Sequence, residues 1–259
     1  VSLSGDGGDE LFCGYGTYQS ITNAWNKIRK IPQPVRSAAG YFLTDGPFSK
    51  KETNQIRGML LSAHNAEELY ARSDLSEPFL GKIAKERGSA RSIFEIYESG
   101  YLADVQHNLM LMDLLMYHPD DILVKVDRTA MAVSLESRVP MLDKDVVEFA
   151  WSLPVWMKWE NGRGKLVLRD VLYRHVPREL MERPKKGFSI PIQKWLKEPE
   201  LYAWAESLLK EDKIRQEGYF DPEMVTRLWK DFTQRGIWRK QIWHILRFED
   251  WLEQEYRKP

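Results

Sequence analysis

The seven residues SGDGGDE at positions 4–10 constrain the fold of this chain more than any other stretch. Glycine at this density permits left-handed backbone and weakens helix and strand alike, so Gly5 to Gly8 must form a loop. The apolar residues Val1 to Leu3 before it predict the end of a buried strand, and Asp9 and Glu10 suit the first turn of a helix. We therefore predict a strand, a glycine loop and a helix, in that order.

The same stretch combines two features that look incompatible. Successive backbone N–H groups in a glycine loop at a helix start favour anions, above all phosphate, whereas the carboxylates of Asp6 and Asp9 would repel it. A divalent cation resolves the conflict, because Mg²⁺ is held by one or two carboxylates together with substrate phosphates. The loop is thus a candidate site for a metal-chelated nucleotide or pyrophosphate. A glycine turn followed by an acidic helix cap explains the residues equally well.

Two later stretches also combine charged residues with glycine or with apolar residues. Residues 183–191, RPKKGFSIP, place three cations and a glycine in a loop that suits phosphate neutralisation or a solvated basic turn. Residues 124–143, VKVDRTAMAVSLESRVPMLD, interleave charges with apolar side chains, which indicates buried ion pairs or direct substrate contact. The charged residues in question are Asp127, Arg128, Glu136, Arg138 and Asp143.

The rest of the chain has mostly helical periodicity. A Met-rich run within residues 92–116 is typical of a buried core helix, since Met fills core gaps well. We expect a turn at His118 to Asp121 and a helix over residues 122–137 that ends before Val139-Pro140. Further helices are predicted at Ala66–Ala71, Asp145–Ser152 and residues 165–175. In the C-terminal third, one helical face carries Trp238, Ile242, Ile245, Phe248 and Leu252.

Composition excludes several classes of function. The formal net charge is zero, so no overall field favours nucleic acid or an anionic membrane. The single cysteine, Cys13, leaves no internal disulfide and indicates a reducing compartment. No apolar run approaches the ~20 residues of a membrane span. Arg and Lys alternate with aromatics over residues 227–251, as in single-strand binders, but the acids among them favour packed amphipathic helices instead.

Taken together, the charged stretches resemble the synthetase domain of the asparagine synthetase family. The motifs are LSGDGGDELFCGY at 3–15, DDILVKVDRTAMAVSLESRVPMLD at 120–143 and GKLVLRDVLYRHVPRELMERPKKGFSIPIQKWL at 164–196. They occur in the family's order and cover roughly the first three quarters of the chain. One such motif would be weak, whereas three in order are hard to assign elsewhere.

The resemblance implies an adenine-nucleotide α-hydrolase-like fold, in which a parallel sheet flanked by helices precedes a helical C-terminal portion. The family's other phosphate loop, Ser-Gly-Gly-x-Asp-Ser, does not occur in these residues, and neither does its glutaminase domain. We therefore expect the chain to start inside its parent domain. Residues 1–259 should form a single, mainly α-helical domain, the helical C-terminal part of an α/β domain with only a late sheet strand at its N-terminus.

The activity that the resemblance implies is amide formation. ATP and a carboxylate, usually the β-carboxyl of aspartate, give an acyl-adenylate and pyrophosphate, and ammonia then attacks. Ammonia normally comes from glutamine through a glutaminase domain of the same chain. The parent would be a cytoplasmic asparagine synthase of the glutamine-hydrolysing type that uses ATP and Mg²⁺, and the chain alone should be inactive.

Site residues follow from the resemblance position by position. Asp9 matches the acid that helps hold Mg²⁺ and pyrophosphate, and Asp6 stands where many synthetases have Glu, at the position linked to forming or aminolysing the adenylate. Lys185 matches the lysine that faces the departing pyrophosphate, with Lys186 as the alternative. Cys13 stands where the family usually has Gly and is not expected to be a nucleophile. The nucleotide would be bound by Ser4, Gly5, Gly7 and Gly8.

Several alternatives stay open at this point. The family also includes enzymes that amidate β-lactam, sugar, peptide or lipopolysaccharide precursors, and nothing in the sequence selects aspartate over those acids. A non-catalytic helical docking module is a rival of another class. The expected partners are a small carboxylate, ATP and the glutaminase domain, without nucleic acid or membrane, and a homodimer is left open.

Overall fold

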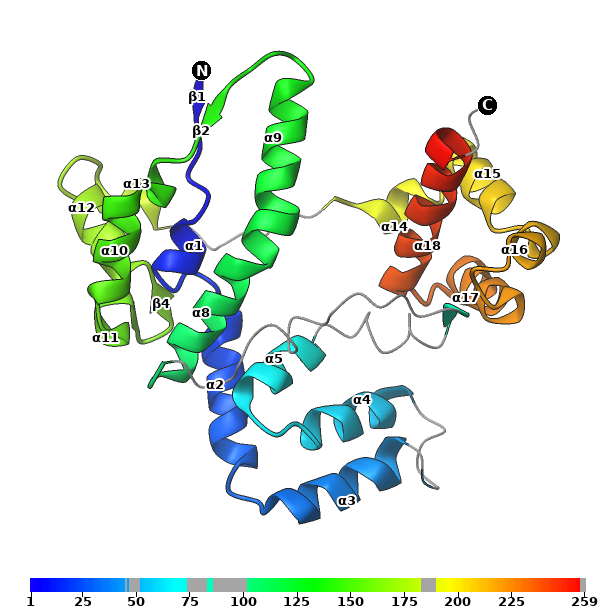
Figure 1. Ribbon diagram of the computed structural model, residues 1–259, viewed down its shortest axis with the longest axis horizontal. Helices are drawn as coiled ribbons and strands as arrows, with labels where there is room; N and C mark the ends of the chain where they lie inside the picture. Colours follow the sequence, from blue (N-terminus) through cyan, green and yellow to red (C-terminus); the bar gives the residue numbers. More distant parts are fainter. Residues whose placement is uncertain (45, 47–51, 74–82, 86–101, 183–189, 257–259) are drawn as a thin grey trace. The chain divides into compact units, whose positions relative to one another are not determined.

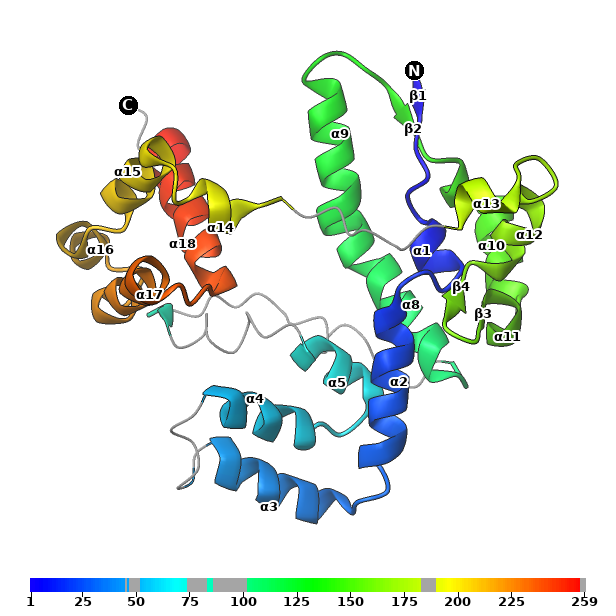
Figure 2. The ribbon, with the colours of Figure 1, turned by 180° about the vertical axis from the view of Figure 1, so that it is seen from behind.

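The computed structural model describes residues 1–44, 46, 52–73, 83–85, 102–182 and 190–256 (Figures 1 and 2). The chain divides into two compact units. Unit 1 combines Val1–Ser73 with Arg91–Pro184, and unit 2 combines Asp74–Ala90 with Lys185–Pro259. The single domain expected over residues 1–259 stays a prediction.

Helices dominate both units, so the mainly α-helical fold predicted from the sequence is confirmed. The elements of unit 1 are β1 (Ser2–Leu3), α1 (Gly8–Leu11), α2 (Gly16–Ile28), α3 (Gln33–Thr44), α4 (Glu52–Leu61), α5 (Ala66–Ser73), α8 (Val105–Leu115), the π-helix η1 (His118–Leu123), α9 (Val124–Met131), β2 (Ser137–Arg138), η2 (Pro140–Leu142), α10 (Lys144–Ser152), α11 (Val155–Lys158), β3 (Trp159–Glu160), β4 (Arg163–Gly164), α12 (Leu166–Leu172) and α13 (Arg178–Met181). Those of unit 2 are α14 (Ile192–Trp195), α15 (Pro199–Leu208), α16 (Glu211–Glu217), α17 (Pro222–Arg235), α18 (Lys240–Trp251) and η3 (Leu252–Tyr256).

The predicted strand at the N-terminus exists. The strand with which it pairs shows that another prediction, the helix over residues 122–137, is wrong in its second half. β1 pairs in parallel with β2, with Ser2 opposite Ser137 and Leu3 opposite Arg138. The helix predicted over 122–137 instead ends at Met131 in α9, because the residues after it are needed as an extended partner for β1. Val1 and Leu3 are 77% and 75% exposed, so the expectation of a buried strand is wrong for these residues.

A second correction concerns the segment that joins α8 to α9. The turn predicted at His118 to Asp121 is a π-helix, η1, which runs directly into α9. Pro119 fits because a proline in the first turn of a helix removes only an N–H that would have no intrahelical partner. π-helical segments are rare and frequently lie at functional sites, and His118 at the start of this one is buried.

The core of unit 1 forms on both sides of the glycine loop and its helix. One cluster joins α2, α5 and α8 through Tyr18, Leu69 and Leu109. The other joins α1 to α10 through Leu11, Phe12 and Ala150. The Met-rich helix α8 contributes buried Met110 and Met112 to the first cluster, as the sequence predicts, although residues 92–101 of its expected range lie outside the described residues. These two clusters hold the end of the glycine loop between them.

Unit 2 is built from helices with clear start and stop signals. Asp221 caps α17 by accepting hydrogen bonds from Glu223 N and Met224 N, both at 3.0 Å, and Gly236 ends the helix in a left-handed conformation. The predicted face of the C-terminal helix is confirmed, because Ile242, Ile245 and Leu252 are buried, and Trp238 and Phe248 pack against the cluster that contains the two isoleucines. Ala84 adds an isolated antiparallel bridge to Phe220.

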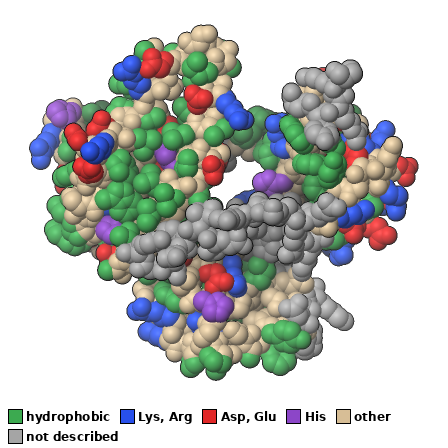
Figure 3. Space-filling model, viewed as in Figure 1, with side chains coloured by type: hydrophobic (Ala, Val, Ile, Leu, Met, Phe, Trp, Pro, Cys, Tyr) green, Lys and Arg blue, Asp and Glu red, His purple; other side chains and the backbone are tan. Residues whose placement is uncertain are grey.

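Apolar side chains also gather on the surface of unit 1. Figure 3 shows a hydrophobic area over the helices that Figure 1 labels α10 to α13. Five large side chains on these helices are between 43% and 69% exposed: Phe149, Trp156, Val171, Leu180 and Met181.

Among the helices that the structure describes, none is long and apolar enough to cross a bilayer.

Candidate active site

The glycine loop runs from the end of β1 to α1, as predicted. Gly7 has a φ of 83° and precedes the first residue of α1, a conformation that favours glycine. A Cβ at Gly7 would lie 2.8 Å from Leu142 Cδ2, so the loop also packs closely on η2. A Cβ at Gly5 would meet no atom within 4 Å, which leaves this corner of the loop open. The loop is therefore tight on one side and open at Gly5.

Ser4 and Asp6 are fixed to each other across the open corner. The Ser4 hydroxyl donates to Asp6 Oδ2, and Asp6 N donates back to Ser4 Oγ at 3.4 Å. Ser4 N in turn donates to Arg138 O at 2.8 Å, which ties the loop to β2. The structure thus brings together two of the predicted site residues and holds the Asp6 carboxylate in one orientation.

The sequence reasoning missed a cation that lies beside this loop, Lys165. Its Nζ donates to Asp9 Oδ2 at 2.8 Å, although 156 positions separate the two residues in the chain. The side chains are 32% and 25% exposed, so the pair lies at the surface of unit 1 without being fully solvated. Lys165 N also donates to Phe12 O at 2.9 Å, which fixes the backbone of the lysine against the turn after α1.

Two glycines make this close approach feasible. A Cβ on Gly14 would lie 2.0 Å from Asp9 Oδ1 and 2.4 Å from Lys165 Cε, so a side chain here would displace the pair from its present position. A Cβ on Gly164 would lie 2.2 Å from Cys13 O, so glycine is needed there for the two backbones to meet. The motif Gly-x-Gly-Lys at residues 162–165 is the sequence signal that marks this approach.

The backbone beside these glycines is also unusual. Cys13 and Lys165 have φ values of 54° and 61°, in the left-handed region that residues with a Cβ rarely adopt. Such conformations cost of order 1–3 kcal/mol each and cluster at functional sites. Two of them face each other where the turn after α1 meets the start of α12, and the Asp9–Lys165 pair lies at that junction.

The basic stretch predicted to face pyrophosphate lies largely outside the described residues. Lys185 and Lys186 fall within 183–189, which the structure does not describe, so the role assigned to Lys185 stays a prediction. The charges of residues 124–143 are described, and the expectation of buried ion pairs is wrong for them. Arg138 pairs with Glu136 at 2.7 Å, but both side chains are more than half exposed. Asp143 instead caps α10 by accepting from Asp145 N at 3.0 Å.

Buried polar side chains form hydrogen bonds in and around α1. Glu10, 1% exposed, accepts a hydrogen bond from the Tyr15 hydroxyl at 2.8 Å, and His118 Nδ1 lies 3.6 Å from Glu10 Oε1. Asp113 accepts from the Tyr18 hydroxyl at 2.6 Å and from Tyr70 at 2.8 Å. Burial and the adjacent carboxylate raise the pKa values of both tyrosines, which therefore stay protonated donors.

A second buried group lies on the other side of the turn after α1. Lys158 is fully buried, its Nζ is 3.1 Å from His107 Nε2, and it lies 5.1 Å from the centre of the Trp151 ring. Burial lowers the Lys158 pKa to about 8. Burial raises the pKa of the Cys13 thiol to about 12, so the thiol is protonated at neutral pH and is a poor nucleophile, as the sequence predicts.

The described residues hold no cluster of three or more His, Cys, Asp or Glu side chains able to bind a metal alone. This donor set still fits Mg²⁺, which is commonly bound by one or two carboxylates and completed by phosphate oxygens and water. Asp9 supplies one such carboxylate at the surface, and Asp6 lies on the same loop. The residues present thus suit a metal that arrives with a phosphate ligand.

Known proteins match this chain in sequence. Residues 1–253 match the family model described as asparagine synthase. The chain is 29% identical over 262 residues to asparagine synthetase (glutamine-hydrolyzing) 1 of Bacillus subtilis, which covers 97% of this chain and 40% of that protein. It is 34% identical over 215 residues to a putative asparagine synthetase (glutamine-hydrolyzing) of Mycobacterium bovis, covering 79% of this chain and 32% of the relative. No solved structure gives a significant match.

Proposed function

This chain belongs to the asparagine synthase family, and from that premise we propose that its protein is an ATP-dependent ligase that forms an amide through an acyl-adenylate. The chain spans about 40% of the Bacillus subtilis relative and 32% of the mycobacterial one. The proposal therefore concerns the full-length protein, and these residues contribute the glycine loop and the lysine that meets it.

The observation that carries the proposal is the Asp9–Lys165 pair at 2.8 Å. An exposed ion pair adds only about 0–1 kcal/mol to stability. This one is nevertheless accommodated by Gly14 and flanked by two residues in left-handed backbone. A costly local conformation around a weak pair favours a binding role over a structural one.

The chemistry that such a pair supports is the departure of pyrophosphate. A carboxylate oxygen of the substrate attacks the α-phosphorus of ATP, and the bond from that phosphorus to the bridging oxygen breaks. Negative charge then grows on the leaving pyrophosphate. Lys165 would stabilise that charge from a fixed position, which is how preorganised donors lower a barrier. Ser4 and the backbone of Gly5, Gly7 and Gly8 would bind the nucleotide beside it.

Asp9, with Asp6 on the same loop, would hold Mg²⁺ when the metal arrives with ATP. The bound metal supplies Lewis-acid polarisation of phosphate oxygens and offsets their charge. Lys165 donates to one carboxylate oxygen of Asp9. We propose that the ammonium group of Lys165 shifts from that carboxylate towards phosphate when the nucleotide binds.

Asp6 would serve the second half of the reaction. An amine nitrogen attacks the acyl carbon of the adenylate, AMP leaves with the electrons of the broken C–O bond, and the nitrogen loses a proton. A carboxylate held by the Ser4 hydroxyl can orient the amine and accept that proton. Asp6 is shorter than Glu, so the loop itself must bring the carboxylate close to the substrate.

We propose aspartate as the substrate and asparagine as the product, with ammonia derived from glutamine. The names of the relatives, glutamine-hydrolyzing asparagine synthetases, support this choice at 29–34% identity. A glutaminase domain in the same chain would be the ammonia source, and the cytoplasm the setting. Another carboxylate acceptor, such as a β-lactam or sugar precursor, is the runner-up.

ATP–pyrophosphate exchange tests the proposal in the full-length protein, because it reports adenylate formation without the amide step. We expect aspartate-dependent exchange, and a fall of about 10²–10³ in rate for Lys165→Ala. Lys185→Ala tests the lysine predicted from the sequence in the same assay. Lys144→Ala, at an exposed position on α10, is the matched control and should leave the rate unchanged.

Each outcome has a distinct meaning. Exchange that survives Lys165→Ala but not Lys185→Ala would move the pyrophosphate contact to the basic stretch. Exchange with a different carboxylate and none with aspartate would replace the substrate while keeping the reaction. Absence of exchange with every carboxylate would end the ligase proposal.

A further inference from the structure

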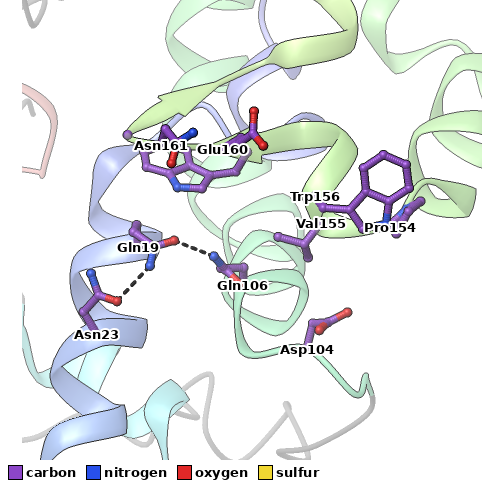
Figure 4. Close-up of a pocket in the computed structure, with 11 residues that line it drawn as sticks. Gln19, Asn23, Asp104, Gln106, Pro154, Val155, Trp156, Glu160 and Asn161 are labelled. Carbon is purple, nitrogen blue, oxygen red and sulfur yellow. Dashed lines mark hydrogen bonds between the residues drawn. The ribbon is translucent and has the colours of Figure 1, made fainter.

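A cavity of about 760 Å³ lies in unit 1 among the N-terminal parts of α2 and α8, α11 and the β3–β4 hairpin (Figure 4). Asp6, Asp9 and Lys165 are not among its lining residues. The volume falls within the range of small-molecule sites, about 300–1,000 Å³. The cavity thus offers room for a ligand that the proposed ligase chemistry does not account for.

One wall of the cavity is a chain of neutral amides. Gln106 Nε2 donates to Gln19 Oε1 at 2.7 Å, and Gln19 Nε2 donates to Asn23 Oδ1 at 2.8 Å (Figure 4). These bonds fix the orientation of the three side chains across α2 and α8. Each amide has two N–H donors and two oxygen lone pairs, so the wall keeps capacity to donate and to accept. Asn161 adds a fourth amide from the hairpin turn.

The other main feature is aromatic. Trp156 and Trp159 line the cavity from α11 and the start of β3. Trp156 is 69% exposed, which is unusual for an indole because this side chain carries a large hydrophobic surface. Indole rings and amides in one lining suit a ligand that is apolar on one face and polar around its rim.

The charges of the lining exclude anionic ligands. Asp104 and Glu160 line the cavity, and among the residues that the structure describes no Lys or Arg does so. Asp104 Oδ2 lies 3.5 Å from His107 Nδ1 behind the wall, so this carboxylate is already engaged. A phosphate or carboxylate ligand would meet two like charges and no cation, whereas hydroxyl groups could donate to both carboxylates.

We propose that this cavity binds a neutral saccharide. A sugar ring has hydroxyl groups around its edge and C–H groups on its faces, which matches four amides, two carboxylates and two indoles. A small organic cation over an indole is the competing occupant, since two carboxylates would attract it. The amides outnumber the carboxylates two to one and are pre-oriented by hydrogen bonds, which favours hydroxyl recognition.

Saturation-transfer NMR and calorimetry on the purified protein test the proposal without ATP or Mg²⁺, so the outcome is independent of ligase activity. The probes are glucose, galactose, mannose and N-acetylglucosamine with the disaccharides maltose, cellobiose, lactose and chitobiose, and choline as the cation. A ligand of this size should bind with a Kd on the order of 1 mM. Trp156→Ala should weaken binding about tenfold, since exposed aromatic anchors contribute that much.

Gln106→Leu keeps the size of the side chain and removes the amide, and it should also weaken binding. Trp195→Ala, at an indole 46% exposed on α14 in unit 2, is the matched control and should have no effect. The proposal is overturned if no saccharide of the panel binds, if choline binds in their place, or if both cavity variants bind as the unchanged protein does.

Discussion

The glycine loop of unit 1 and the helices α16 and α18 of unit 2 differ in how their charged side chains are paired and how far they are buried. In unit 1, Asp9 and Lys165 pair one to one with about a quarter to a third of each side chain exposed, inside strained backbone. In unit 2, Lys213 on α16 contacts Glu217 at 3.2 Å, Glu249 at 2.7 Å and Glu253 at 3.2 Å. Glu249 and Glu217 are 0% and 2% exposed in helices of ordinary geometry.

Under the proposed function, the contrast separates charge that would serve chemistry from charge that serves packing. A buried carboxylate is costly unless it is paired or protonated; unit 2 surrounds one lysine with acids and raises the pKa of Glu249 to about 7, so that this carboxyl is partly protonated at neutral pH. A site that must release a ligand keeps its charges accessible and holds them by backbone geometry instead. Accessible charge in a strained setting is therefore the better indicator of function in this protein.

The largest expected effect comes from filling the space beside the exposed pair. Gly14→Ala places a Cβ on Asp9 Oδ1 and Lys165 Cε, both of which belong to movable side chains. We expect ATP–pyrophosphate exchange to fall about 10²–10³-fold, as for loss of one electrostatic partner, with little change in Tm. Gly16→Ala is the control, since its Cβ meets no atom within 4 Å. Equal exchange rates in the two variants would contradict a role for the pair.

A smaller effect is expected from the buried cluster, and it concerns stability. Burial raises the pKa of Glu249 to about 7 from an ordinary 4.5, so folding favours its protonated form. The contribution of Glu249 to stability is fully present below the pKa that its carboxyl has in the unfolded chain. This contribution is lost as the pH rises through the pKa that the carboxyl has in the folded protein. The free energy of unfolding of unit 2 should fall by on the order of 2 kcal/mol between about pH 5 and pH 8.

Hydrogen exchange of the α18 amides measures this locally, because their protection reports the opening of that helix. Glu249→Gln keeps a neutral side chain at every pH and should flatten the dependence. Glu211→Gln is the control, at a side chain 47% exposed on α16, the helix that carries Lys213. This variant should keep the pH dependence of the protection. A pH dependence that persists in Glu249→Gln would assign the titration to another group.

Local signals in the sequence were sufficient for much of the fold and for one side of the site. The strand, loop and helix at residues 1–11 follow from glycine density and acidic first-turn residues, and α18 follows from apolar spacing. Ser4, Asp6 and Asp9 could be named because they share one short motif. Each of these features depends on residues close together in the chain.

Features that depend on distant contacts were missed. Ser137 and Arg138 follow a run of good helix formers and are extended only because β1 lies beside them. Lys165 is one of three cations between residues 163 and 169, and its backbone contact with Phe12 holds it beside Asp9. The glycines just before Lys165 were a usable signal of a close backbone contact, but nothing in the sequence indicates which loop Lys165 contacts.

The most direct test of the account is a double-mutant cycle on Asp9 and Lys165 in the full-length protein, read as the rate of ATP–pyrophosphate exchange. Asp9→Asn, Lys165→Met and the double variant are compared with the unchanged protein. If the two groups act together on one metal-bound phosphate, the double variant should be about as slow as the slower single variant, because residues of one unit are strongly non-additive. Single effects that multiply in the double variant would show that Asp9 and Lys165 act separately, and would contradict a shared site.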